Sequence, residues 1–150
     1  MICSMIQKTQ IKTQIDKTKE EKGQGATFNG DLSVWNTDKG GYIATITMDN
    51  VEKVSLKDIQ QFKNKYDKVI RENPNNVKIG IFNLANDDGI DIDLNVRVTD
   101  KQKAIEIGQK FNQESVFDAY NFECISTGGR GESKDLSIDE ILAVLDEYLN

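Results

Sequence analysis

The stretch that decides the fold reads Asn86-Asp87-Asp88-Gly89-Ile90-Asp91-Ile92-Asp93-Leu94-Asn95-Val96-Arg97-Val98-Thr99. A turn signal at its start leads into a strand in which apolar and polar side chains alternate without a fault. Because successive side chains of a strand point to opposite faces, one face is built for burial and the other is polar and mostly acidic. The stretch therefore predicts a sheet that other elements cover on its apolar face.

Hairpins and amphipathic helices flank this stretch on both sides. Alternating, β-branched segments predict further strands over residues 32–36, 42–48, 77–84, 115–120 and 123–126. Helices are expected to begin after N-caps at Ser55, at Thr99 or Asp100, and at Ser137, where Glu140 completes a capping box. The pattern predicts an α+β fold, an antiparallel sheet of hairpins with amphipathic helices on one face, in the order β-β-α-β-β-α-β-β-α.

Apolar spacing indicates which side of each helix is buried. The first helix carries one stripe at helical spacing, made of Leu56, Ile59, Phe62, Tyr66, Val69 and Ile70. Asn73-Pro74 is expected to end it, because proline cannot continue a helix. Gly108 costs its helix roughly 1 kcal/mol against alanine, so we expect that helix to approach the sheet closely there. The single tryptophan, Trp35, is expected in the core.

The chain is long enough for one domain of 150 residues. Residues 1–25 are sparse in apolar side chains and predict a polar N-terminal arm or tail, which leaves residues 26–150 as a single α+β domain. No apolar run reaches the ~20 residues that span a membrane, and the N-terminus is too short for a signal-peptide core. The cytoplasm of a bacterial host cell is the expected location.

Composition restricts the chemistry that is available. The chain has no histidine and only two cysteines, Cys3 and Cys124. Histidine-dependent nucleophile pairs, histidine bases and the common zinc sites are therefore excluded, and we expect neither an enzyme nor a bound cofactor. The formal net charge is -6, which argues against direct nucleic-acid binding and suits a protein partner with a basic surface. The same charge also serves simple solubility.

Four acidic residues in the opening stretch, Asp87, Asp88, Asp91 and Asp93, are candidates for a site. Carboxylate oxygens suit Mg²⁺ or Ca²⁺, but Gly89 comes too early for an EF-hand loop and no glutamate closes that loop. Alternating aspartates on the wet face of a strand are usually only solvated, and they also guard a sheet against aggregation. We therefore predict no metal site, and rank a solvated face first, a partner-binding surface second and a catalytic site third.

A glycine-rich loop gives a second candidate site: Thr127, Gly128, Gly129, Arg130 and Gly131. Its backbone N–H groups and the arginine would suit a phosphate. The loop matches neither the P-loop, which needs Gly-Lys-Ser/Thr opening a helix, nor the dinucleotide fingerprint. A flexible linker to the last helix is the favoured interpretation, and phosphate or ligand binding is the alternative.

From Tyr42 to Gly129 the chain resembles a small domain, without an established activity, that recurs in phage and mobile-element proteins. The resemblance is carried by the hairpin from Ile79 to Asp93, by Asp100, Ala104 and Gly108, and by the run Asn112-Gln113-Glu114-Ser115-Val116-Phe117-Asp118 followed by Thr127-Gly128-Gly129. Phe82 and Phe117 stand where members of that domain often have tryptophan. The resemblance implies a phage or mobile-element origin and an α+β fold, and it implies no catalytic residues.

These observations together favour a non-enzymatic, acidic protein-binding module of phage or mobile-element origin. A concrete version is an inhibitor of host defence, such as an anti-CRISPR protein, whose acidic strand and turn occupy a basic groove of a host defence nuclease. The alternatives are a small-ligand or phosphate-binding module that uses the Thr127 to Gly131 loop, and a phage structural protein.

Overall fold

The computed structural model describes residues 13–20, 25–83, 89–131 and 135–149. Six antiparallel strands form one sheet in the spatial order β1-β3-β4-β2-β5-β6. The strands are β1 (Gly25–Phe28), β2 (Tyr42–Val51), β3 (Val77–Asn83), β4 (Ile90–Val98), β5 (Ser115–Asp118) and β6 (Glu123–Ser126). The helices are α2 (Leu56–Lys65), α3 (Asp67–Glu72), α4 (Lys101–Lys110) and α5 (Ile138–Leu149), with a short 3₁₀ turn η1 (Thr37–Lys39). The predicted α+β class is confirmed, and the predicted order is only roughly matched.

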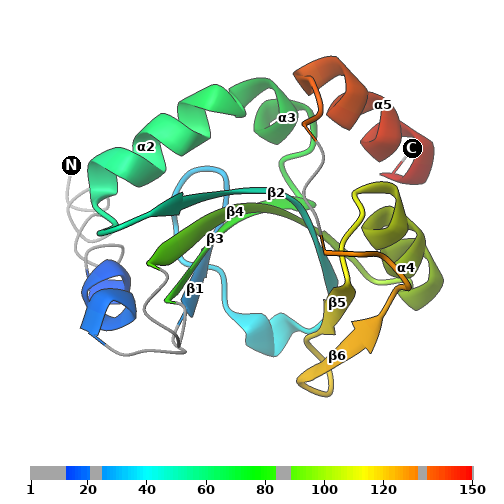
Figure 1. Ribbon diagram of the computed structural model, residues 1–150, viewed down its shortest axis with the longest axis horizontal. Coiled ribbons are helices and arrows are strands. Elements are labelled where there is room, and N and C mark those ends of the chain that lie inside the picture. The colour runs from blue at the N-terminus through cyan, green and yellow to red at the C-terminus, as the bar shows by residue number, and fades with distance from the viewer. Residues whose placement is uncertain (1–12, 21–24, 84–88, 132–134, 150) are drawn as a thin grey trace.

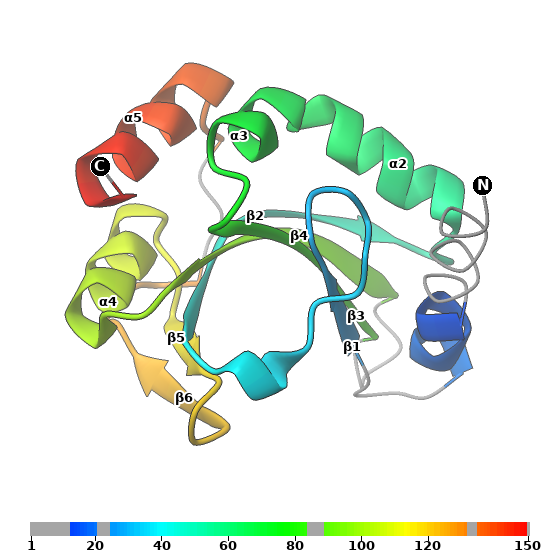
Figure 2. The same cartoon turned by 180° about the vertical axis from the view of Figure 1, so that it is seen from behind.

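The sheet is arched, and its helices lie on the convex side (Figure 1). In the same view η1 and β6 lie on the opposite, concave side, and the view from behind shows the same arrangement (Figure 2). Part of the curvature has a local cause, because the pairing of β2 with β4 shifts register between Thr45 and Thr47. A bulge of this kind bends the strand and increases its twist. The two faces of the sheet therefore have different surroundings.

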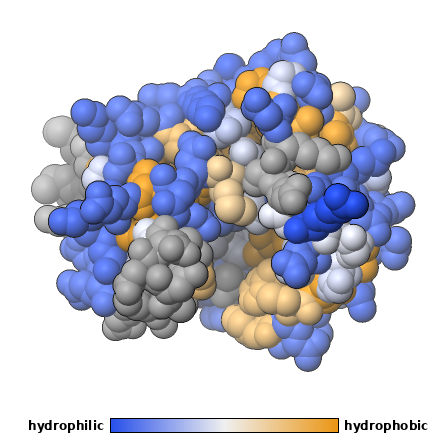
Figure 3. Space-filling view, in the orientation of Figure 1, coloured by the Kyte–Doolittle hydropathy of each residue, from blue (hydrophilic) through white to orange (hydrophobic). Residues whose placement is uncertain are grey.

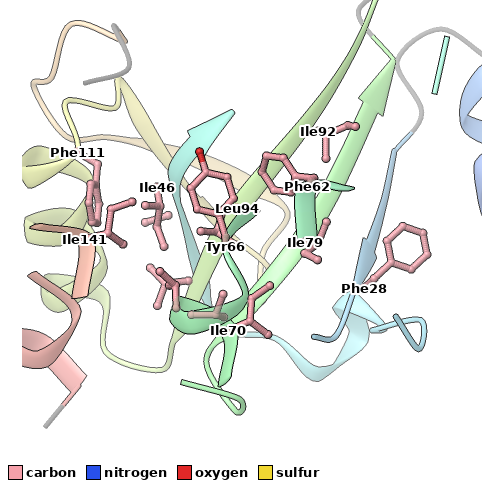
Figure 4. Close-up of a cluster of buried hydrophobic side chains, with 14 of the residues drawn as sticks. Phe28, Ile46, Phe62, Tyr66, Ile70, Ile79, Ile92, Leu94, Phe111 and Ile141 are labelled. Carbon is pink, nitrogen blue, oxygen red and sulfur yellow. The ribbon is translucent and has the colours of Figure 1, made fainter. Parts of the chain in front are cut away.

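The opening stretch supplies β4, which lies inside the sheet between β3 and β2. Its five alternate apolar residues are all buried, as predicted: Ile90, Ile92, Leu94, Val96 and Val98. They belong to one cluster with residues of the helices, among them Phe62, Tyr66, Ile70, Phe111 and Ile141 (Figure 4). Burial of this apolar surface against the helices is the main stabilisation of the fold.

Capping residues begin the helices where the sequence predicts. Ser55 caps α2 in a complete capping box with Asp58, and Asp100 caps α4. Ser137 and Glu140 exchange the two hydrogen bonds of a capping box at the start of α5. The predicted first helix is divided at Tyr66 into α2 and α3, and Asn73 ends it as expected. Its apolar stripe still packs on the sheet, because the break leaves Phe62, Tyr66 and Ile70 buried.

The first predicted hairpin is wrong in its first strand. Residues 32–36 were expected to pair with the strand that follows them, but only Val34 makes an isolated bridge, and its partner is Phe28. The first strand is β1, which pairs with β3 at the edge of the sheet, while β2 lies between β4 and β5. β1 contains two small residues, Gly25 and Ala26, in only four positions, so the strand has little apolar pattern of its own. Pairing with β3 therefore stabilises a strand that the local sequence does not predict.

Gly108 makes the close approach that its cost to the helix predicts. A Cβ at this position would lie 2.9 Å from methyl groups of both Val116 and Thr127. α4 is thereby held against β5 and against the segment that follows β6. Within the predicted N-terminal arm, residues 13–20 are helical, and Ile15 is buried in the core cluster. No helix among the described residues combines the length and apolar character needed to cross a membrane.

Substitution at the centre of β4 tests this account of the core. Leu94 is fully buried between the sheet and the helices, so Leu94→Ala should lower the free energy of unfolding by about 2–5 kcal/mol through lost burial and the cavity left behind. The matched control is Leu142→Ala on α5, where the side chain is only half-buried, and its cost should be clearly smaller. Urea unfolding followed by circular dichroism measures both. Equal costs would contradict the central position of β4.

Candidate functional site on the concave face

The polar side of β4 faces the concave side of the sheet. Residues directly paired across strands share a face, and the register places Gly80 opposite Asp93 and Thr45 opposite Asn95. Ile43 and Phe117 join the same face through the pairing of β2 with β5. The predicted solvated strip of aspartates is therefore the middle row of a wider surface that five other strands extend.

A directional chain of hydrogen bonds runs along this face. Thr45 Oγ1 donates to Asn95 Oδ1 over 2.9 Å, and Asn95 Nδ2 donates to Asp93 Oδ1 over 2.7 Å. Asn95 is buried and Thr45 is half-buried. The chain orients the amide of Asn95, because its oxygen accepts from Thr45 and its nitrogen donates to the carboxylate. Asp93 is thus the acceptor at which the chain ends.

Gly80 makes room for the Asp93 carboxyl group. A Cβ on Gly80 would lie 2.1 Å from Asp93 Oδ1 and 2.8 Å from Asn95 Nδ2. A glycine inside a strand is unfavourable on its own, and it commonly marks a place where another group approaches the backbone closely. Here that group is the carboxylate on the neighbouring strand. Any side chain at position 80 would push Asp93 out of its place.

Asp93 has an unusual protonation equilibrium for an aspartate. Burial raises the pKa of its carboxyl group to about 6, against a hydrogen bond from Asn95 that lowers it, and the negative charge of Asp91 adds to the rise. The residue stays half-buried, since it lies on the floor of a cleft that opens to solvent. Near neutral pH the carboxyl group is therefore mostly ionised but poorly solvated. Titratable groups with such shifted pKa values are found more often at functional sites than elsewhere.

Trp35 closes one end of the concave face. It lies in the loop between β1 and β2, its backbone N–H donates to the Thr27 carbonyl, and only 5% of its surface is exposed. Its ring lies near two cations, with Lys78 Nζ 5.8 Å and Arg97 Cζ 5.5 Å from the ring centroid. The prediction that Trp35 is buried is confirmed. It does not belong to the main core cluster, however, because it packs on the opposite face of the sheet.

Both cations at this closed end have neutral acceptors. Lys78 Nζ donates to Asn29 Oδ1 over 2.7 Å. Arg97 donates through Nε to the carbonyl of Gly40 and through Nη2 to that of Lys39. Burial, together with the charges of Arg97 and Lys39, holds the pKa of Lys78 below its usual value. These bonds tie the loop with Trp35 to β3 and β4.

The remaining part of the concave face is an open cleft of about 900 Å³. Its floor includes Thr45, Gly80, Asp93 and Asn95, and its walls carry Trp35, Phe82, Phe117, Phe122 and Cys124. Phe82 and Phe122 are 42% and 63% exposed at the mouth, and Phe122 meets Phe117 edge-on with ring centroids 6.0 Å apart. Figure 3 shows the molecule hollowed below its centre, with hydrophobic side chains gathered at the lower edge of the hollow.

The turn between β5 and β6 positions Phe122. Asp118 accepts hydrogen bonds from the backbone N–H groups of Tyr120 and Asn121 and from the Asn121 side chain. The bond with Asn121 holds the pKa of Asp118 below its usual value, so the turn keeps a charged acceptor at neutral pH. Phe122 itself has a φ of 55°, a conformation that side chains other than glycine adopt at some cost. The surroundings therefore hold an exposed aromatic ring at the cleft in a strained backbone.

The four predicted aspartates do not form one described cluster. Asp91 lies on the concave face, where its Oδ1 accepts from Asn50 Nδ2 over 2.9 Å, and Asp93 lies on the cleft floor. Asp87 and Asp88 lie outside the described residues. Within the part of the chain that the structure describes, no group of three or more acidic, cysteine or histidine side chains is placed to hold a metal ion.

The hydrogen-bond donors of the predicted phosphate loop are mostly used in bonds to other parts of the protein. Thr127 is buried, and its hydroxyl donates to the Gln113 carbonyl. Most of the loop N–H groups have protein acceptors: Thr127 donates to Glu114, Gly129 to Thr127 Oγ1, and Arg130 and Gly131 to Asn112. A phosphate would have to replace these bonds, so the loop between β6 and α5 is better suited to fixing the chain against α4 than to binding an anion.

Sequence reasoning missed Thr45, Gly80, Asn95 and the aromatic walls as members of one site. One signal was present, since Gly80 lies inside a predicted strand, between Ile79 and Ile81, and such a glycine points to a close contact. The partner in that contact depends on the register between β3 and β4, which places Asp93 and not Asp91 opposite the glycine.

A double-mutant cycle tests the contact between Gly80 and Asp93. Gly80→Ala should destabilise the protein by roughly 1–3 kcal/mol, because the new Cβ displaces the carboxylate. In an Asp93→Ala background the same change should cost less, which gives a coupling of roughly 0.5–3 kcal/mol in the free energy of unfolding. The control cycle pairs Gly80→Ala with Asp91→Ala and should show little coupling. Coupling of similar size in both cycles would disprove the specific contact.

The pH dependence of stability tests the state of Asp93. The carboxyl pKa is higher in the folded protein, about 6, than its ordinary value of 3.8, so the folded state binds the proton more tightly. Asp93 therefore favours folding at low pH, and this contribution disappears as the pH rises through the interval between the two values. Relative to Asp93→Asn, the wild type should lose up to about 3 kcal/mol of unfolding free energy between about pH 4 and pH 7. Urea unfolding of both proteins at several pH values measures the difference, and a constant or rising difference would refute it.

Comparisons with known proteins found no match for this chain. No family model matches the chain, and neither a curated protein nor a solved structure is significantly similar to it. We therefore infer the function from the residues of the concave site itself.

Proposed function

We propose that the protein is a non-enzymatic binding module that takes a small organic ligand in its concave cleft. One observation carries the proposal: the Asp93 carboxylate occupies the space that Gly80 leaves on the cleft floor, oriented by Asn95 and poorly solvated. A charged group kept in such a place costs folding free energy. A ligand that donates a hydrogen bond to the carboxylate would offset that cost in the bound state.

The shape and lining of the cleft suit a ligand of small-molecule size. Its volume of about 900 Å³ lies in the range of roughly 300–1,000 Å³ that is usual for such sites. Apolar and aromatic walls surround a few polar groups that converge on the floor, which is the usual design of a ligand pocket. The hydrogen-bonded chain from Thr45 to Asp93 would orient the ligand, and the walls would remove its apolar surface from water.

The chemistry of the lining favours binding over catalysis. Among the described residues that line the cleft, Asp93 is the one acidic residue, and the whole chain lacks histidine. Acid–base catalysis commonly uses two titratable groups, one as the acid and one as the base. The described neighbours of the Asp93 carboxylate in its hydrogen-bonded chain are a neutral amide and a hydroxyl group, which do not fill the second role. Cys124 lines the wall as an exposed thiol, and no histidine exists to activate it.

A second candidate function is the binding of a protein partner with a basic surface. The exposed rings of Phe82 and Phe122 at the mouth favour it, because exposed aromatic side chains are typical anchors of interfaces. Only Asp91 and Asp93 of the expected acidic surface are described. The phage or mobile-element origin and the anti-CRISPR role stay predictions, as does phosphate binding by the Thr127 to Gly131 loop.

Two natural reporters in the cleft test the proposed function. Trp35 is the only tryptophan, so its fluorescence reports on the cleft alone. In a Cys3→Ser background, Cys124 is the only thiol, and its alkylation rate reports whether the cleft is occupied. We expect a screen of small polar fragments to contain members that shift Trp35 emission and slow alkylation of Cys124 together, because one bound molecule contacts both walls.

The matched control moves the thiol to the other face of β6. Glu123→Cys combined with Cys3→Ser and Cys124→Ser places a thiol one residue away on an exposed position outside the cleft lining. Fragments that protect Cys124 should leave this thiol unprotected. If no fragment protects Cys124, or if both thiols are protected equally, the cleft is not the ligand site and the proposal fails.

A further inference from the structure

We propose that the ligand of the concave cleft is an organic cation, a protonated amine or guanidinium carried on an apolar body. This inference rests on the proposed function of the cleft as a ligand site, and it names the chemistry that the site selects. Three features lead to it: the charge on the floor, the engagement of the nearby cations, and the aromatic walls.

The floor of the cleft is negative. The Asp93 carboxylate lies there, and the neighbouring charge that acts on it is that of Asp91, two residues along the same strand face. An ionised carboxylate only accepts hydrogen bonds, and its donor on the same strand, the Asn95 amide, is neutral. A cation would supply a charge-assisted hydrogen bond, which is shorter and stronger than a neutral one. An anionic ligand would instead meet two negative charges of the same strand.

Two described cations of this face, Lys78 and Arg97, are directed elsewhere. Lys78 is only 5% exposed and donates to Asn29, while two nitrogens of Arg97 donate to carbonyl groups of the loop from Asn36 to Gly40. Trp35 lies close to both of them. Their hydrogen-bond donors thus serve the closed end of the face, and the open part of the cleft keeps the acidic floor.

Aromatic walls add a second source of selectivity. Phe82 enters from β3, and Phe117 and Phe122 enter from β5 and its turn, so rings stand on both sides of the mouth. The face of an aromatic ring attracts a cation and also buries an apolar body. Exposed rings around a carboxylate are the combination that distinguishes an organic cation from a hydrated metal ion, because only the former offers an apolar surface.

Three probes that share one aromatic ring and differ in charge test the inference. Benzylammonium, benzyl alcohol and benzoate each carry the same ring, and their affinities are measured by Trp35 fluorescence and by protection of Cys124 in the Cys3→Ser protein. We expect benzylammonium to bind about tenfold or more tightly than benzyl alcohol, which corresponds to one charge-assisted hydrogen bond. Benzoate should bind more weakly than either. Asp93→Asn should abolish the preference for the cation, whereas Asp91→Asn should retain most of it, because Asp91 lies outside the cleft lining.

The outcomes separate this inference from the proposed function. If the alcohol or benzoate binds as well as benzylammonium and still protects Cys124, the cleft is a ligand site but not one for cations, and the inference fails alone. If none of the probes protects Cys124 up to its solubility limit, while fragments of the broader screen do, the inference again fails alone. If nothing protects Cys124, both fail. The comparison of probes on the wild-type protein decides the matter even if Asp93→Asn does not fold.

Discussion

The structure depends on β4, a strand whose two faces must pack against different surroundings. β4 is paired on both sides, and its two rows of side chains must satisfy two different surroundings. Five apolar residues on one row hold α2, α3, α4 and α5 on the convex side by burial. The other row carries charge, which restricts what can cover the concave side. That restriction leaves a cleft there instead of a second hydrophobic core.

Close backbone approach converts this polar row into a site. Gly80 removes the side chain that would stand opposite Asp93, and the bulge in β2 bends the sheet around Thr45. The Asp93 carboxylate lies against β3, accepts a hydrogen bond from the Asn95 amide, and is poorly solvated. A longer side chain at position 80 would send Asp93 into solvent with an ordinary protonation equilibrium. The site therefore follows from one missing methyl group and one register.

Local patterns predicted much of the fold and only part of the site. The capping residues Ser55, Asp100 and Ser137, the stripe that includes Phe62 and the alternation of β4 were all readable, because each depends on neighbours within one or two turns. The strand Gly25–Phe28 was not, since its pairing with β3 joins residues more than fifty positions apart. The same holds for Trp35, whose burial was predicted but whose side of the sheet was not. Asp93 was named as a candidate for its charge, and its half-burial opposite Gly80 required the register.

The sequence by itself determined an α+β chain with a central strand of two unlike faces, helices that start at defined caps, and a chemistry without histidine. These properties follow from residue type and spacing, which act at short range. Only the tertiary structure decided that β1 pairs with β3, that the loop with Trp35 closes one end of the concave face, and that Asp93 shares a cleft with Phe82, Phe117 and Phe122. The physical reason is that these contacts arise from curvature and from pairing between distant segments, and their free energy depends on register, which no local pattern in the chain encodes.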